Sequence, residues 1–204
     1  MRFEIDKLNW NKGNELIPAI IQDSRTLQVL MLGYMNKESL KKTIKDKKVT
    51  FFSRTKQRLW QKGEESGNFL NVIEITSDCD ADTLLIKVEP EGPTCHLGNT
   101  SCFDKEEASG VGFIATLERI VEDRFKNPTK ESYTSSLFEK GIHRIVQKVG
   151  EEATEVVISA MSSKDEEFEN EVADLIFHLL VLLKIKDVKF EDIIEVLMKR
   201  HKKK

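Results

Sequence analysis

The first half of the chain carries short hydrophobic runs with the length and composition of β-strands. They are rich in Val, Ile, Leu, Phe and Thr, and turn residues such as those at 63–68 separate them. The runs lie at 29–35, 49–52, 70–75 and 83–88. One helix is also expected, because Asn36 is a favourable N-cap and Leu40 and Ile44 are four residues apart. Residues 1–103 therefore predict a β-rich α+β unit.

Beyond residue 108 the hydrophobic period changes from two to about 3.6 residues, which is the period of an α-helix. Apolar positions mark four amphipathic stretches, at 113–121, 142–160, 172–183 and 193–197. Their short connections predict an all-α helix bundle. The polar, glycine-ended segment between the halves is typical of a linker, at 104–112. We therefore expect two domains, 1–107 and 108–204.

Composition and charge exclude several classes of partner. The chain has a net charge of -3, and its basic residues show no surplus that would indicate a nucleic-acid partner. No apolar run approaches the roughly 20 residues that span a bilayer, and the first residues lack the apolar core of a signal peptide. Its three cysteines are an odd number, and the thiols of an unsecreted protein stay reduced, so metal binding or burial is expected rather than a disulfide. The expected location is the cytoplasm.

The densest group of potential metal ligands in the first half is Asp-Cys-Asp-Ala-Asp at 78–82. If this segment is extended, its aspartates share one side and Cys79 points to the other. Carboxylate oxygens suit Mg²⁺, and the candidates are Asp78, Asp80 and Asp82. Thiolates suit Zn²⁺ and would leave one position for water or His96; the candidates are Cys79, Cys95 and Cys102. A polar loop and buried cysteines remain the alternative.

A basic segment follows the second hydrophobic run and is compatible with an anionic substrate. An arginine and small hydroxyl side chains in loops suit a phosphate group. The candidate substrate-binding residues are Arg54, Trp60, Lys62 and Ser66. A solvated basic hairpin is the alternative interpretation of the same composition.

Five segments of the first half resemble phosphoribosyl-AMP cyclohydrolase: 29–36, 52–54, 59–68, 78–82 and 95–96. The resemblance implies Mg²⁺ on the three aspartates and Zn²⁺ on the three cysteines, with ligands shared across a homodimer. It also implies that a zinc-activated water attacks C6 of the N1-alkylated adenine, after which the N1–C6 bond opens. His96 is the candidate proton shuttle, because imidazole titrates near neutrality. Ala81 and Leu97 depart from the usual glycine and threonine.

Two acidic pairs stand out in the helical half. Glu152 and Glu155 are three residues apart, as are Glu171 and Asp174, so each pair shares a helix face. Facing helices would bring the four carboxylates together as a divalent-metal site. An exposed acidic face is the alternative, but the adjoining apolar stretches favour partial burial, where unpaired carboxylates would be costly.

The acidic pairs resemble the signature of the all-α nucleoside-triphosphate pyrophosphatases, the MazG-like group. More narrowly, residues 132–137, 148–155 and 173–180 look like phosphoribosyl-ATP pyrophosphatase. The resemblance implies Mg²⁺ bound to the acidic residues and to the triphosphate, with Glu152 and Glu155 taking part in catalysis. Arg144 and Lys148 are the candidate phosphate contacts, with ordinary solvated positions as the alternative. His178 is expected to support the site or the core.

The two halves together predict two consecutive hydrolyses in histidine biosynthesis. The expected product of the helical half, phosphoribosyl-AMP, is the substrate of the cyclohydrolase-like half. The helical half would therefore act first, on phosphoribosyl-ATP, as a nucleotide-binding enzyme. The alternative is a housekeeping nucleoside-triphosphate pyrophosphatase with a zinc-stabilised, non-catalytic N-terminal module. Both resemblances also imply a homodimer.

Overall fold

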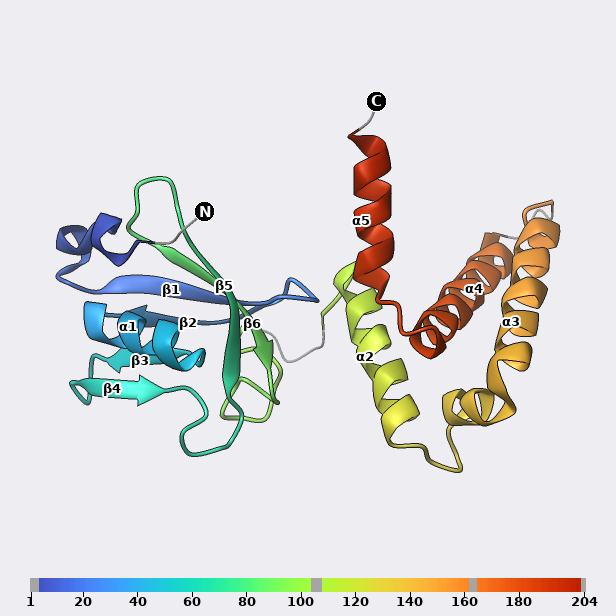
Figure 1. Cartoon of the computed structure of the whole chain (residues 1–204), viewed down its shortest axis with the longest axis horizontal. Coiled ribbons are helices and arrows are strands. Elements are labelled where there is room, and N and C mark those ends of the chain that lie inside the picture. Colours follow the sequence, from blue (N-terminus) through green and yellow to red (C-terminus); the bar gives the residue numbers. More distant parts are fainter. Residues whose placement is uncertain (1–3, 104–107, 162–164, 203–204) are drawn as a thin grey trace. The chain divides into compact units, whose positions relative to one another are not determined.

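A computed structural model describes residues 4–103, 108–161 and 165–202 of the chain. The chain forms two compact units, Met1–Phe113 and Ile114–Lys204. The first is β-rich and the second is helical, which confirms the expected fold class (Figure 1). The domain boundary near residue 108 stays a prediction, and residues 104–107 of the expected linker lie outside the described residues.

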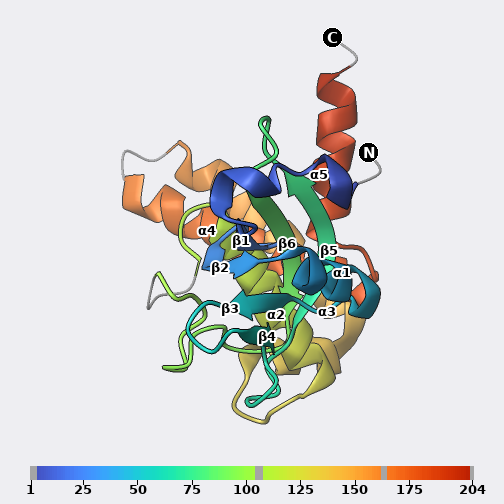
Figure 2. The ribbon, with the colours of Figure 1, turned by 90° about the vertical axis from the view of Figure 1, so that its left-hand side faces the viewer.

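A four-stranded sheet forms the centre of the N-terminal unit, with the strand order β2–β1–β6–β5 (Figure 2). The strands are β1 (Ile17–Asp23), β2 (Val29–Met35), β5 (Leu70–Ser77) and β6 (Leu84–Pro90). Strand β1 pairs antiparallel with β2 and parallel with β6, and β5 pairs antiparallel with β6. The sequence interpretation missed β1, whose hydrophobic run contains Pro18, a residue that normally argues against a central strand.

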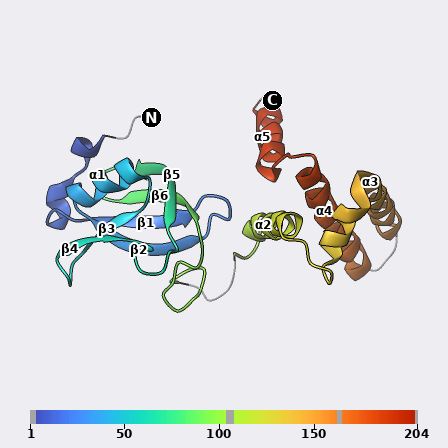
Figure 3. The ribbon, with the colours of Figure 1, turned by 60° about the horizontal axis from the view of Figure 1, so that its bottom comes forward.

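Helix α1 (Lys37–Asp46) and the hairpin of β3 (Thr50–Ser53) and β4 (Arg58–Gln61) complete this unit (Figure 3). The predicted N-cap is confirmed: the Asn36 side chain accepts from Ser39 N at 2.8 Å, and the Ser39 hydroxyl accepts from Asn36 N at 2.9 Å. This capping box satisfies two backbone donors that a helix start leaves unpaired. Leu40 of α1 and Phe51 of β3 are buried in the same core as the sheet.

Two short 3₁₀ helices precede the sheet, η1 (Ile5–Lys7) and η2 (Trp10–Gly13). Trp10 anchors this segment, because its side chain is buried in the core and its indole N–H donates to Ile5 O at 3.0 Å. The backbone N–H of Asn9 donates to Ala81 O at 2.7 Å, which ties the segment to the connection between β5 and β6.

The helical unit contains the four helices that the sequence predicts. They are α2 (Gly112–Lys126), α3 (Tyr133–Ser159), α4 (Asp165–Ile185) and α5 (Phe190–His201). Helix α3 runs through Gly150 and kinks at Gly141, where φ is +78°. Glycine tolerates this left-handed conformation.

Three helices build the core of this unit. Its buried residues are Val121 from α2, Leu137 and Ile145 from α3, and Leu180 and Val181 from α4. Helices α3 and α4 lie side by side (Figures 1 and 3). Helix α5 has no buried residue. In the part of the chain that the structure describes, no helix is long and apolar enough to cross a membrane.

Candidate metal and substrate sites

The three aspartates of the first half lie in the connection between β5 and β6. One carboxylate oxygen from each of Asp78, Asp80 and Asp82 lies within 4.8 Å of the others. The expected extended conformation is wrong, because residues 79–82 form turns and bends. The Asp78 carboxylate accepts from Asp82 N at 3.0 Å and Thr83 N at 3.1 Å, and Ala81 is left-handed with a φ of +59°. A carboxylate-stabilised turn, rather than strand alternation, therefore gathers the aspartates.

Lys12 of η2 reaches into this carboxylate cluster. Its Nζ lies 2.5 Å from Asp80 Oδ2 and 2.5 Å from Asp82 Oδ2. The hydrogen bond from Lys12 lowers the pKa of Asp82, and the bonds to both aspartates raise the pKa of Lys12. The three carboxylates offer hard oxygen donors of the kind that Mg²⁺ prefers. The sequence interpretation missed Lys12, because no local pattern connects it to residues 78–82.

Two of the three candidate zinc ligands lie together. The loop after β6 is held by bonds from Cys95 N to Asn99 O at 2.9 Å and from Cys102 N to Leu30 O at 2.7 Å. Partial burial raises the pKa of the Cys102 thiol, the adjacent Cys95 thiol raises it further, and nearby Lys62 lowers it. A metal ion would favour the thiolate form of such a pair.

The third candidate zinc ligand, Cys79, is exposed on the aspartate turn. Among the described residues of this chain, it forms no group with Cys95 and Cys102 in which all the ligand atoms lie within 4.8 Å. One chain thus brings two of these thiols together, and the three cysteines are free of disulfides.

The remaining candidates of the first half have separate local environments. The Arg54 guanidinium lies 3.8 Å from the centre of the Tyr34 ring, and Trp60 stacks on Phe51 with ring centres 5.7 Å apart. Lys62 is buried, although a lone lysine rarely is. The Ser66 hydroxyl accepts from Asn68 N at 3.3 Å in an exposed loop. His96 is exposed on the turn beside Cys95.

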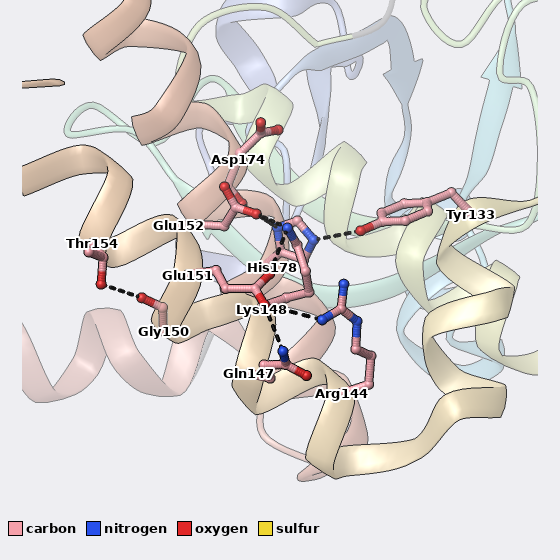
Figure 4. Close-up of polar contacts among 10 residues, drawn as sticks. All are labelled: Tyr133, Arg144, Gln147, Lys148, Gly150, Glu151, Glu152, Thr154, Asp174 and His178. Carbon is pink, nitrogen blue, oxygen red and sulfur yellow. Dashed lines mark hydrogen bonds and ion pairs between the residues drawn. The ribbon is translucent and has the colours of Figure 1, made fainter. Parts of the chain in front are cut away.

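The helical unit holds a second carboxylate cluster. Oxygens of Glu152 and Glu155 from α3 and of Glu171 from α4 lie within 4.8 Å of one another. The pKa of Glu152 is lowered, first by a hydrogen bond from Lys148, whereas the hydrogen bond to Glu152 raises the pKa of Glu155. The raised pKa reflects crowded negative charge that a divalent cation would relieve. Asp174 lies one turn further along α4, beside Glu152 but outside this group of three (Figure 4).

Two basic side chains of α3, those of Arg144 and Lys148, contact acidic side chains at this site (Figure 4). The Lys148 ammonium contacts Glu152 and lies 3.2 Å from Glu151 Oε2. Arg144 also binds Glu151, at 3.2 Å. Glu151 was not among the predicted site residues, yet it holds both candidate phosphate contacts beside the cluster.

His178 of α4 is buried next to Glu152 (Figure 4). Its Nδ1 lies 2.9 Å from Asp174 O and 3.9 Å from Glu152 Oε1. Its Nε2 lies 3.2 Å from the Tyr133 hydroxyl. Because the carbonyl can only accept, Nδ1 donates to it, and in the neutral ring Nε2 accepts from Tyr133. Sequence reasoning found His178 and missed Tyr133, which begins α3 far from α4 in the chain.

A β-rich unit with an oxygen cluster and a thiol pair, joined to a helical unit with its own carboxylate cluster, indicates a two-domain metal-dependent hydrolase. Comparison with protein-family models identifies the family of each unit. Residues 31–104 match the model of phosphoribosyl-AMP cyclohydrolase, and residues 114–201 match the model of phosphoribosyl-ATP pyrophosphohydrolase.

Whole-chain relatives agree with both matches. The chain is 52% identical to the histidine biosynthesis bifunctional protein HisIE of Bacteroides thetaiotaomicron over 96% of each chain. It is 54% identical to the protein of the same name from Buchnera aphidicola, over 97% of this chain and 95% of the relative. The chain therefore belongs to the family of bifunctional histidine-biosynthesis enzymes that join these two activities. The housekeeping alternative is not supported, because the relatives share both halves.

Proposed function

We propose that the helical unit hydrolyses phosphoribosyl-ATP to phosphoribosyl-AMP and pyrophosphate, and that the N-terminal unit then opens the adenine ring between N1 and C6. The grouping of Glu152, Glu155 and Glu171 from two helices carries the first assignment. The aspartate turn and the Cys95–Cys102 pair carry the second. The order of the units along the chain is thus opposite to the order of the reactions.

In the helical unit, we assign Glu152, Glu155, Glu171 and Asp174 as Mg²⁺ ligands. Bound Mg²⁺ neutralises phosphate charge and orients the groups that react. Glu152 and Glu155, the two carboxylates that α3 contributes to the cluster, would take part in catalysis by holding the metal that activates the attacking water.

Arg144 and Lys148 would bind the phosphates of the nucleotide. Both cations form ion pairs with the Glu151 carboxylate beside the cluster, at 3.2 Å each. When a nucleotide phosphate replaces Glu151 as their partner, both cations stay paired with a negative group. The site therefore needs no further positive charge to bind the nucleotide.

In the N-terminal unit, we assign Cys79, Cys95 and Cys102 to Zn²⁺ and the aspartates of the turn, Asp78, Asp80 and Asp82, to Mg²⁺. Zinc on thiolates with an open position lowers the pKa of a bound water toward about 7. His96, exposed beside Cys95, would carry protons between solvent and the reacting ring. Arg54, Trp60, Lys62 and Ser66 would bind the phosphoribosyl and adenine groups.

We also propose that the enzyme is a cytoplasmic homodimer. Cys79 is separate from the other two thiols within one chain, and a second copy could supply it. The helical unit also exposes apolar side chains that a second copy could cover. On α5 these are Ile193, Ile194, Val196, Leu197 and Met198. Native mass measurement tests the dimer, and a monomer that retains zinc would contradict it.

The zinc assignment is tested with Cys95→Ser in the full chain. We expect loss of bound zinc and of ring opening, with pyrophosphate release retained by the other unit. Full ring opening by a zinc-free variant would contradict the assignment.

The magnesium assignment is tested with Glu171→Gln, using Glu167→Gln as the control. Both residues lie on α4, and Glu167 is exposed outside the cluster. Only Glu171→Gln should raise the Mg²⁺ concentration required for pyrophosphate release. The substrate assignment is tested by supplying ordinary deoxynucleoside triphosphates in place of phosphoribosyl-ATP. Equal pyrophosphate release from the two kinds of nucleotide would contradict the assignment.

A further inference from the structure

The lysine in the aspartate turn comes from a distant, separately anchored segment. Trp10 fixes η2 in the core, and the bond from Asn9 N to Ala81 O fixes the segment against the turn. Lys12 lies two residues after Trp10. Its ammonium extends between Asp80 and Asp82, at 2.5 Å from one carboxylate oxygen of each. Its position in the cluster is therefore a consequence of the fold.

We propose that Lys12 is a built-in cation that fills the aspartate cluster in the metal-free chain and competes with the divalent cation for it. This inference rests on the proposed Mg²⁺ site at Asp78, Asp80 and Asp82. The ammonium and a metal ion would need the same oxygens of Asp80 and Asp82, so both cannot hold them at once.

The side chain of Lys12 can leave without disturbing the fold. It is 52% exposed, and its four-carbon stem rotates freely in solvent. The anchors of the segment, the Trp10 side chain and the Asn9 backbone, do not involve the lysine. Arrival of a divalent cation would therefore displace one flexible side chain while the turn keeps its shape.

Competition makes two opposite predictions for a variant without the ammonium. Without metal, three crowded carboxylates lose their counterion, so the variant should unfold at a lower temperature than the wild type. With metal, no lysine has to be displaced, so the cation should bind more tightly. Since two exposed charge pairs are lost, we expect an increase in affinity of about tenfold.

The experiment measures Mn²⁺ binding and thermal unfolding of the full-length, zinc-loaded protein, with Mn²⁺ as the probe. Lys12→Met is compared with the wild type, and Lys12→Gln gives the same comparison if the methionine variant does not fold. Lys7→Met is the matched control, because Lys7 is exposed on η1 and pairs with Glu4 instead. Asp80→Asn identifies which class of Mn²⁺ sites belongs to the turn.

We expect Lys12→Met to increase the Mn²⁺ affinity of the class of sites that Asp80→Asn weakens or removes. We expect it to lower the melting temperature of the zinc-loaded protein only when no Mn²⁺ is added. Lys7→Met should change neither quantity. Unchanged or weaker Mn²⁺ binding at that class in Lys12→Met would overturn the competition while leaving the metal site intact. If Asp80→Asn affects no class of sites in the wild type, the proposed metal site fails, and the inference fails with it.

Discussion

Glu152→Gln separates the chemistry of the helical site from its stability. Glu152 is 3% exposed and lies between the Lys148 ammonium and the crowded carboxylates of the cluster. The substitution removes one negative charge while it keeps the size of the side chain and one oxygen that accepts hydrogen bonds. Any large effect must therefore come from the charge.

The structure indicates a large effect on activity and a small one on folding. Loss of a residue that only supports a metal ligand costs about 10- to 100-fold, so loss of a ligand should lower pyrophosphate release by about 100-fold or more. Folding should change by about 1 kcal/mol or less. Lys148 keeps Glu151 at 3.2 Å, and Glu155 loses the neighbour that raises its pKa.

The assay follows pyrophosphate release and adenine ring opening in one protein preparation. Ring opening reports on the N-terminal unit and serves as an internal control. Glu139→Gln is the external control, because Glu139 is exposed on the same helix and outside the cluster. Undiminished pyrophosphate release would refute the assignment of Glu152, and an equal fall in both activities would show general damage instead.

Three further substitutions test the surrounding structure. Gly33→Ala should destabilise the N-terminal unit by about 1–3 kcal/mol in denaturant unfolding, because a Cβ there would lie 2.4 Å from the Phe51 ring; unchanged stability would contradict this. Ala81→Gly should stabilise by about 1 kcal/mol or less, since it relieves a left-handed alanine at some cost in chain entropy; clear destabilisation would contradict this. Glu122 has a lowered pKa, first through Lys126, so its contribution to stability is present near neutral pH and is lost as the pH falls through that lowered pKa. Wild type and Glu122→Gln should therefore differ in unfolding free energy at about pH 7 and converge as the pH falls through that lowered pKa, and a difference that is independent of pH would contradict this.

Elements with a local signal could be predicted from the sequence, and elements that depend on distant partners could not. The run Val29–Met35 forms β2 with the predicted bounds, and Asn36 caps the next helix. Strand β1 was missed because Pro18 weakens its local signal, while its place in the sheet comes from pairing with β2 and β6. The pairing with β6 joins residues far apart in the chain and leaves no local signal to detect.

The candidate sites also divide into contacts that a local sequence pattern predicts and contacts that depend on distant residues. The spacing of Glu152 and Glu155 on one helix predicts that their carboxylates meet, and they do. The aspartates also meet, but by a turn that the alternation argument did not foresee. The contact between Tyr133 and His178 could not be predicted, because 45 residues separate them.

Both carboxylate clusters hold a lysine ammonium, and the two lysines should respond differently to a metal ion. Lys148 lies on the same helix as its partners, and Glu151 offers it a second carboxylate outside the cluster, at 3.2 Å. It can therefore release Glu152 and remain paired. The two carboxylates that Lys12 contacts, Asp80 and Asp82, both belong to its cluster. A cation that enters the turn must therefore return this ammonium to solvent, and we expect removal of the lysine charge to tighten metal binding more at the aspartate turn than at the helical site.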